Sequence, residues 1–445
     1  MLLSNPELAP LILAAILALI KLCQYILSSI LGTSFKTLRP KRLWQLDPFL
    51  GLDTVVSSYH RLRLHRFLST CQERFTQAGN TYVARIPGSE IIVTCEPENL
   101  KALLATQHQD FELGERRRHA FRPLLGDSIF ASDGHIWKEA RQQLRPSFAK
   151  DRLSRAETID IHVNALVETV HAQQKRDGIV DLQELFFRFS LDVATSFLFG
   201  DSCHSLSAAK ANDSAATEFA DAFNRSQQRL VDRFVVGSVA DFVPNSQFKK
   251  DCLTVRTFAE KYVNIAINRS RGEESGDISK QPPSILADMA GQCGDIGQLR
   301  DQALSLLVAG RDTTASLLSN LFFVLSRSPN IWHRLKAEVE TLEGRRPDPA
   351  EFKDLKYLQG CIREYLADRY AENLALAEVE CTVVKFLQHF DRMSAVGPSD
   401  WKEQLTLTCC VKDGVKVTLR PREDIQGDLQ NYEQELLEVP AFREG

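Results

Sequence analysis

Small, acidic and hydroxyl side chains interrupt a long apolar pattern between Leu304 and Ser319. Ala309 and Thr313 lie four residues apart, so they would share one face of a helix. Gly310 has no side chain, which would let a flat ligand approach the backbone. A threonine hydroxyl can bond the carbonyl four residues earlier or leave that carbonyl to a water molecule. A gap in the helix surface of this kind, which we call the notch, is suited to delivering the protons that dioxygen chemistry requires.

The same residues have a simpler interpretation. An isolated Asp-Thr-Thr sequence, here Asp312 to Thr314, is more often part of a buried helix with incidental polar residues. The chemical interpretation therefore depends on other motifs that accompany it.

Trp137 and Arg141 form a second candidate constellation, preceded by the string from Gly126 to Gly134. At a spacing of four, an indole N–H and a guanidinium lie on one helical face, where two donors could hold a carboxylate. A surface cation–π pair explains Trp-x-x-x-Arg equally well.

Composition excludes several function classes. The 445 residues carry 54 basic and 58 acidic side chains, a formal net charge of -4, so no global field favours nucleic acid. The ten cysteines are scattered without Cys-x-x-Cys spacing, which favours a reducing, cytosol-facing location. The ten histidines show no His-Glu-x-x-His motif, so a metal held by side chains alone is not indicated.

The N-terminus carries an apolar run from Leu8 to Ile20 that resumes after Lys21 as far as Leu31. A helix of that extent could span a bilayer, and the basic residues that follow from Lys36 are typical of a cytosolic flank. We expect a membrane anchor over residues 1–35 and a basic linker over residues 36–52. A cleaved secretory peptide is the alternative.

The remaining elements predict a mainly α protein with small peripheral β-sheets. Residues 82–94 favour a hairpin around Pro87-Gly88, and residues 405–407 and 415–419 favour another around Lys412-Asp-Gly414. Between them, helical periodicity recurs over residues 152–175, 182–199, 214–236, 248–270 and 299–326. We expect one catalytic domain over residues 53–425, and a tail over residues 426–445.

The hexapeptide Ala309-Gly310-Arg311-Asp312-Thr313-Thr314 resembles the oxygen-binding helix of the cytochrome P-450 family. The resemblance implies that Asp312 and Thr313 deliver protons to bound oxygen, with Arg311 at a permissive position. It also implies that Ala309 and Gly310 lie against haem.

Two upstream segments extend the resemblance. The helix with Trp137 and Arg141 resembles the family's propionate-binding helix, and the Gly126–Gly134 string resembles a fungal branch that oxidises alkanes and fatty acids.

The resemblance breaks after Glu364, the acid of the family's Glu-x-x-Arg pair. Ala367 stands where the arginine belongs, and Glu372 to Phe390 resembles a helix that in the family comes after the haem-ligand loop. That loop, Phe-x-x-Gly-x-Arg-x-Cys-x-Gly, is missing, and Arg369 aligns with its cysteine. Arginine cannot be deprotonated to bind iron. Cys361 and Cys381 are the nearest thiols, but both lie in helical patterns.

Family membership implies a haem-dependent monooxygenase of long-chain alkanes or fatty acids, made doubtful in this chain by the missing cysteine. It further implies a lipid-like small-molecule substrate, an NADPH-dependent flavoprotein reductase as partner, and an endoplasmic reticulum membrane location with the body in the cytosol. The alternative is a non-catalytic, truncated membrane protein. The internal break, near residues 367–371, is more typical of a gene-model or splicing error than of an evolved deletion.

Overall fold

The computed structural model describes residues 40–148, 153–207, 214–237, 240, 245–271, 284–291, 295–348, 350–365 and 373–422. They divide into two compact units, one within residues 40–52 and 73–100, the other within residues 53–72 and 101–422.

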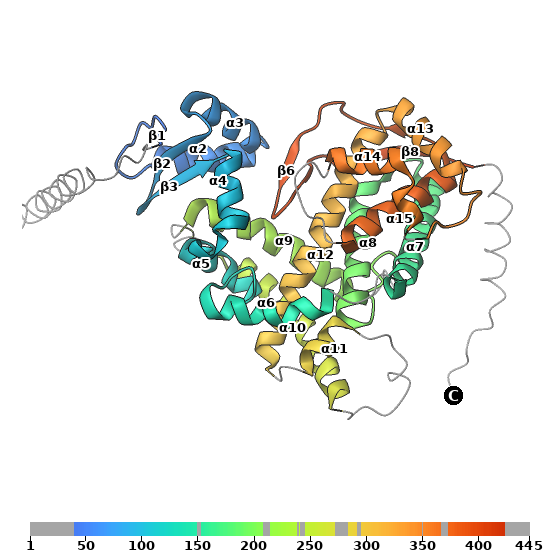
Figure 1. Ribbon diagram of the computed structural model, residues 1–445, viewed down its shortest axis with the longest axis horizontal. Coiled ribbons are helices and arrows are strands. Elements are labelled where there is room, and N and C mark those ends of the chain that lie inside the picture. The colour runs from blue at the N-terminus through green and yellow to red at the C-terminus, as the bar shows by residue number, and fades with distance from the viewer. Residues whose placement is uncertain are drawn as a thin grey trace, which may run out of the picture. The chain divides into compact units, whose positions relative to one another are not determined.

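The larger helices carry most of the chain (Figure 1). They are α2 (Leu52–Arg63), α3 (Phe67–Ala78), α5 (Gly114–Leu125), α6 (Gly134–Phe148), α7 (Leu153–Asp177), α8 (Leu182–Phe199), α9 (Ser214–Val236), α10 (Ser246–Ser270), α12 (Ile296–Leu325), α13 (Pro329–Glu340), α14 (Lys356–Tyr365) and α15 (Asn373–His389). Shorter helical segments are α4 (Pro97–Lys101), a π turn (Ala102–Thr106), α11 (Ile285–Ala290) and two 3₁₀ turns (His108–Asp110, Glu351–Lys353).

The strands form three small sheets. Their bounds are β1 (Lys41–Arg42), β2 (Thr81–Ile86), β3 (Ser89–Thr94), β4 (Val180–Asp181), β5 (Phe390–Ala395), β6 (Glu403–Leu405), β7 (Cys409–Val411) and β8 (Lys416–Pro421). The sheet orders are β1-β2-β3, β4-β8-β5 and β6-β7.

The first unit is built on the hairpin β2-β3, which confirms the hairpin predicted around Pro87-Gly88. Gly88 has φ 81°, a conformation that favours glycine in tight turns. Lys41 pairs in parallel with Tyr82, so the segment predicted as a linker contributes a strand. Tyr82 and Leu43 belong to the small core of this unit.

The second unit is organised around α12, which packs most extensively on α8 and also contacts α10 and α15 (Figure 1). One apolar core surrounds the first half of α12 and includes residues of α5, α9 and α10. Another surrounds its second half and includes residues of α7, α13, α14 and α15. Because α12 is buried along most of its length, its polar residues must find partners inside the protein.

Capping residues explain where the two central helices begin. The Asp295 side chain accepts a bond from the Gln298 backbone N–H at 2.7 Å at the start of α12. Asp181 does the same for Gln183 at 3.1 Å at the start of α8. These bonds satisfy N–H groups that a helix leaves free in its first turn. Helix α8 ends at Gly200, whose φ of 78° lies in the left-handed region.

The helical predictions are confirmed. The five long periodic segments correspond to α7, α8, α9, α10 and α12, and the predicted late helix corresponds to α15. The mainly α fold class with small sheets is confirmed as well.

The predicted second hairpin is wrong. Strand β6 pairs with β7, and β8 pairs with β5 and β4, so residues 405–407 and 415–419 belong to different sheets. The reason is a tight turn in which the Thr406 backbone N–H donates to the Thr408 carbonyl at 2.8 Å and closes β6 on β7. Strand β8 is then left to pair with β5, which follows α15 directly.

The predicted anchor, residues 1–35, and the tail from residue 426 lie outside the described residues. Among the helices described between residues 40 and 422, none combines the length and the apolar character needed to cross a membrane.

Candidate active site

One face of α12 borders an apolar chamber of about 400 Å³. Ala309 and Gly310 line it, together with side chains from α6, α8, α11 and the loop after α5. We call this cavity the apolar chamber; its walls include Phe130, Leu144, Phe197, Leu198, Ile285 and Leu306. Its volume lies within the roughly 300–1,000 Å³ usual for small-molecule pockets.

Helix packing does not require a glycine at position 310. A Cβ placed on Gly310 would lie 3.5 Å from the Ala194 Cβ of α8, an ordinary van der Waals contact. An alanine would therefore fit between α12 and α8. The predicted role of Gly310, to let a flat ligand approach the backbone, stays a prediction.

Arg141 and Arg145 of α6 also line the apolar chamber, at exposed positions. The Arg141 guanidinium lies 5.3 Å from the centroid of the Trp137 ring, which is the cation–π pair considered as the alternative for this motif. The two guanidinium groups give the chamber a cationic border that suits a carboxylate.

The Gly126–Gly134 string begins with a loop docked on α12. The Asp127 N–H donates to Asp301 Oδ2 at 3.1 Å, and the Ile129 N–H donates to Gln302 Oε1 at 3.1 Å. Gly126 has φ 60°, and a Cβ there would lie 1.8 Å from Asp301 Oδ2. The glycine is therefore required by this close approach.

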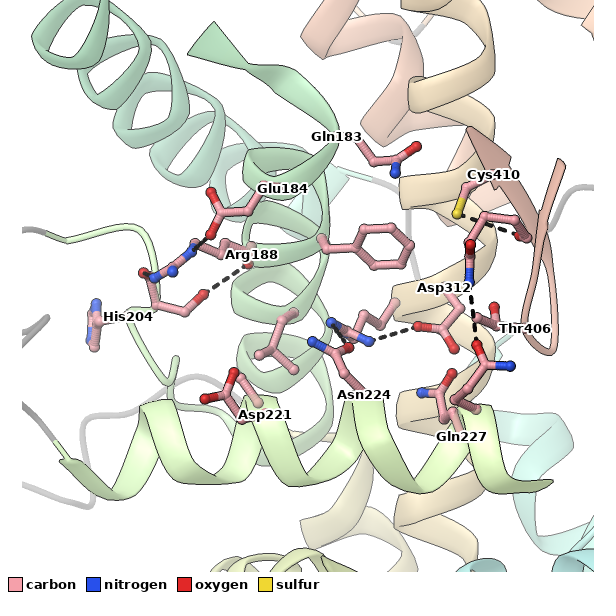
Figure 2. Close-up of a pocket in the computed structure, with 17 residues that line it drawn as sticks. Gln183, Glu184, Arg188, His204, Asp221, Asn224, Gln227, Asp312, Thr406 and Cys410 are labelled. Atoms are coloured by element: carbon pink, nitrogen blue, oxygen red, sulfur yellow. Dashed lines mark hydrogen bonds and ion pairs between the residues drawn. The ribbon is translucent and has the colours of Figure 1, made fainter. Parts of the chain in front are cut away.

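The neighbouring face of α12 borders a second cavity of about 420 Å³, which we call the polar chamber. It lies between α8, α9, α12 and the β6-β7 hairpin, and Figure 2 shows its polar side chains converging. The residues used below are Asn224, Gln227, Arg311, Asp312, Thr406 and Cys410. Sequence reasoning missed this cavity, because its walls come from segments far apart in the chain.

The two residues predicted to handle protons lie in different surroundings. Asp312 is 1% exposed and lines the polar chamber, whereas Thr313 is exposed and lines neither chamber. The Thr313 hydroxyl donates to the Ala309 carbonyl at 2.6 Å, a bond within its own helix. Burial raises the pKa of the Asp312 carboxyl, and the adjacent Arg311 opposes that rise.

Glu364 lies at the end of α14 and is exposed. The resemblance implies a buried ion pair at this acid, with Ala367 in place of the arginine; the exposed position instead leaves the Glu364 carboxylate to be solvated by water. Ala367 and Arg369 lie outside the described residues.

A family model for cytochrome P450 matches residues 45–371. The chain therefore belongs to the cytochrome P450 family. The match ends where the sequence resemblance breaks, between Ala367 and Glu372.

Named relatives agree with this assignment. The chain is similar to cytochrome P450 monooxygenase himC of Aspergillus japonicus, at 30% identity over 473 residues, covering 86% of this chain and 84% of the relative. It is 38% identical to cytochrome P450 52A12 of Debaryomyces hansenii, covering 72% of this chain and 64% of the relative. With cytochrome P450 52A4 of Candida maltosa the identity is 41%, and the shares are 63% and 54%.

The chain thus spans less than two thirds of the length of these two 52A relatives. The himC alignment is longer than the 445 residues of this chain, so the relative carries residues that the chain lacks. Among solved structures, a cytochrome P450 (CYP102L1) superposes with a TM-score of 0.63 at 17% identity, covering 81% of this chain and 98% of that chain. This likeness confirms the fold.

Haem is the cofactor of the family, and its thiolate form needs an apolar bed, cations for the propionates and a cysteine on the iron. The apolar chamber supplies the first two, but no cysteine, histidine or methionine is among its described lining residues. Cys361 and Cys381 lie in α14 and α15, as predicted. Burial raises the pKa of both thiols, that of Cys381 to about 12.

Cys410 is the described thiol that lines the polar chamber, and burial raises its pKa to about 12. A thiol in that state is a poor metal ligand. The described residues therefore fit the body of a porphyrin and its carboxylates, but they do not fit thiolate-ligated haem.

Proposed function

We propose that this chain carries the site of an oxygen-dependent monooxygenase that hydroxylates long-chain alkanes or fatty acids, without the cysteine that the reaction needs. One observation carries the proposal: Asp312 is buried on α12 within one helical turn of Ala309 and Gly310, which border the apolar chamber, while Asp312 itself lines the polar chamber. A buried acid so close to an apolar cavity could supply protons for the oxidation of an apolar substrate. The name of the Aspergillus relative as a monooxygenase supports the reaction class.

In this proposal Asp312 holds and releases protons, and Thr313 receives them when its hydroxyl leaves the Ala309 carbonyl. Arg141, with Trp137 stacked against it, binds a carboxylate at the border of the apolar chamber. Ala309 and Gly310 leave room beside α12.

A second candidate function, that of a non-catalytic scaffold, is favoured by the missing iron donor. The described lining of the apolar chamber contains no thiol, imidazole or thioether. A chain of this composition would keep the helical architecture without turning over substrate.

Membrane association belongs to the same proposal. In the first unit six large apolar side chains are exposed: Trp44 at 79%, Leu46 at 77%, Phe49 at 77%, Ile92 at 67%, Leu50 at 47% and Leu52 at 46%. Exposed aromatic and aliphatic side chains of this kind favour contact with a lipid surface. We propose anchoring in the endoplasmic reticulum membrane, with an NADPH-dependent flavoprotein reductase as the electron donor.

Carbon monoxide binding tests the missing ligand. We expect the purified full chain, supplied with hemin and reduced under carbon monoxide, to lack the absorption band of thiolate-ligated haem. A clear thiolate-type band would contradict the assignment of the chain as lacking its ligand.

The transcript across codons 364 to 372 separates the two candidate functions. A skipped segment that encodes an arginine three residues after Glu364, and a Phe-x-x-Gly-x-Arg-x-Cys-x-Gly loop, is expected for the monooxygenase. A continuous transcript without such a segment would leave only the non-catalytic scaffold.

A further inference from the structure

Arg311 occupies the position of the sequence motif that accepts any residue, yet it is among the most buried charged side chains of the described residues. Its residue exposure is 2%. The guanidinium carbon lies 4.9 Å from the centroid of the Phe187 ring of α8 and 5.3 Å from that of Phe223 of α9. Cation–π contacts strengthen when they are desolvated, so the two rings hold the guanidinium in place.

The polar contacts of Arg311 join two helices, through Asp312 of α12 and Asn224 of α9, both of which are labelled in Figure 2. Nη1 donates to Asp312 Oδ1 at 2.9 Å, and Nη2 donates to Asn224 Oδ1 of α9 at 2.7 Å. Because Asn224 comes from α9, the neighbouring helix fixes the guanidinium that in turn contacts Asp312.

Three further polar atoms at this site make no hydrogen bond of regular geometry within the described residues: Arg311 Nε, Asp312 Oδ2 and Gln227 Nε2. The Gln227 amide nevertheless lies close enough to Asp312 to lower the pKa of its carboxyl. All three residues line the polar chamber. A buried carboxylate with one oxygen bonded and the other directed at polar groups keeps its orientation only while its cationic partner stays in place.

Other charged and titratable groups also face this site. Glu184 and Arg188 of α8, Asp221 of α9, and His204 line the same chamber at less buried positions. The thiols of Cys203 and Cys410 lie close enough to Arg311 to act on its charge. Of all these groups, Arg311 makes the ion pair with Asp312.

We propose that Arg311 is a positioning residue that holds the Asp312 carboxylate ionised and turned toward the polar chamber, and that Asn224, Phe187 and Phe223 hold Arg311 for this task. The inference deepens the proposed function, on which it rests only for the chemical role of Asp312. The competing explanation is that Arg311 only fills space between two phenylalanine rings. It predicts that the stability lost on replacing Arg311 does not depend on Asp312.

A double-mutant cycle on the full chain distinguishes the two explanations. The variants are Arg311→Met, Asp312→Asn and the double variant, with urea unfolding followed by tryptophan fluorescence. Each single change leaves one buried charge unpaired, which raises the unfolded-to-folded ratio by roughly 100-fold or more. The double variant should return to within about tenfold of the starting chain, because no buried charge remains. Additive losses would overturn the proposal.

The pH dependence gives a second readout that a filler would not change. Without Arg311, burial leaves the folded-state pKa of Asp312 above its unfolded value, so the folded state gains a proton that the unfolded state releases. The loss caused by Arg311→Met should therefore be smaller at pH 5 than at pH 7.5. Arg311→Lys, which keeps the charge, should recover part of the stability at pH 7.5. Equal losses at both pH values would contradict the inference.

Arg116 is the matched control. Its guanidinium lies 5.7 Å from the Phe234 ring centroid and donates to the Phe234 and Val235 carbonyls. Arg116→Met should cost the same with and without Asp312→Asn. If the single variants do not fold, protease resistance in cell extracts replaces urea: a double variant more resistant than both singles supports the proposal, and equal resistance refutes it.

The cycle needs neither haem nor substrate. Its outcome is therefore independent of the carbon monoxide and transcript experiments. A failure of the Arg311 inference can thus be distinguished from a failure of the proposed function.

Discussion

Residues 309–312 of α12 separate the polar chamber from the apolar chamber. The two chambers differ in whether the described residues provide all the groups that their proposed chemistry needs. Around the polar chamber, a buried ion pair is held by two aromatic rings and by an amide from another helix. Around the apolar chamber, apolar walls and two guanidinium groups are present, but the described lining offers no ligand for a metal ion. The two faces of α12 thus differ: one holds a fixed ion pair, and the described lining of the other offers no ligand for iron.

This difference limits what the α12 motif can establish. Arg311 and Asp312 are tied into helix packing, so the fold has its own reason to keep them. An intact motif on α12 is therefore no proof of catalysis. Substitutions on each face of α12 can test this difference separately.

The largest effect is expected at the loop that walls the apolar chamber. Gly126→Ala places a Cβ within 1.8 Å of Asp301 Oδ2 and forces alanine into φ 60°. Strain and overpacking together should lower the free energy of unfolding by about 3–5 kcal/mol. Urea titration of the variant measures this loss.

Gly310→Ala is the control for that substitution. Its Cβ would make an ordinary contact of 3.5 Å with Ala194, and alanine favours a helix over glycine by about 1 kcal/mol. Unchanged or slightly raised stability is expected. A loss as large as that of Gly126→Ala would mean that the α8 contact is tighter than described.

A somewhat smaller effect is expected on stability at low pH, and it arises from His389, which lines neither chamber. The ring centroids of His171 and His389 lie 5.9 Å apart, and burial, followed by Lys385 and His171, lowers the pKa of His389 to about 4. The unfolded value is about 6.5, so the unfolded state binds more protons between these limits. Stability is full above pH 6.5 and is lost as the pH falls toward 4, by up to about 3 kcal/mol.

His389→Gln should flatten this acid loss while leaving the pH dependence of Arg311→Met in place. Unfolding free energies at pH 4.5, 6 and 7.5 measure both. An acid loss unchanged by His389→Gln would assign the response to other groups, with His171 first among them, because burial lowers its pKa as well.

The smallest stability effect is expected for Thr313→Ala. The Thr313 hydroxyl is exposed and bonds only its own helix in the described structure. The free energy of unfolding should change by less than about 0.5 kcal/mol. A larger loss would show that Thr313 contributes to packing, and would weaken the contrast with Arg311.

Helix periodicity predicted most of the fold, because long amphipathic segments such as Ser214–Val236 bury one face whatever their neighbours. Strand pairing was harder. Strand β8 required a partner, β5, that the sequence pattern assigned no role, so its hairpin was misplaced. Short strands take their register from tertiary contacts rather than from their own residues.

The site was only partly predictable for the same reason. Ala309, Gly310 and Arg141 were found from local spacing, and they do line one chamber. The role of Arg311 depends on Asn224 and Phe187, which are distant in sequence and meet it only after folding. The sequence did contain one indication of this role, an arginine beside an acid within an apolar helix, because a buried charge must be paired.

The loop that follows α5 has a mechanical consequence. Its Asp127 and Ile129 amides are bonded to side chains of α12, so this wall of the apolar chamber moves as one body with the helix. Helix α8 is packed closely against α12 as well. A ligand too large for the chamber would therefore make room by displacing α6 or the six-residue α11, and amide exchange in those two helices should respond first.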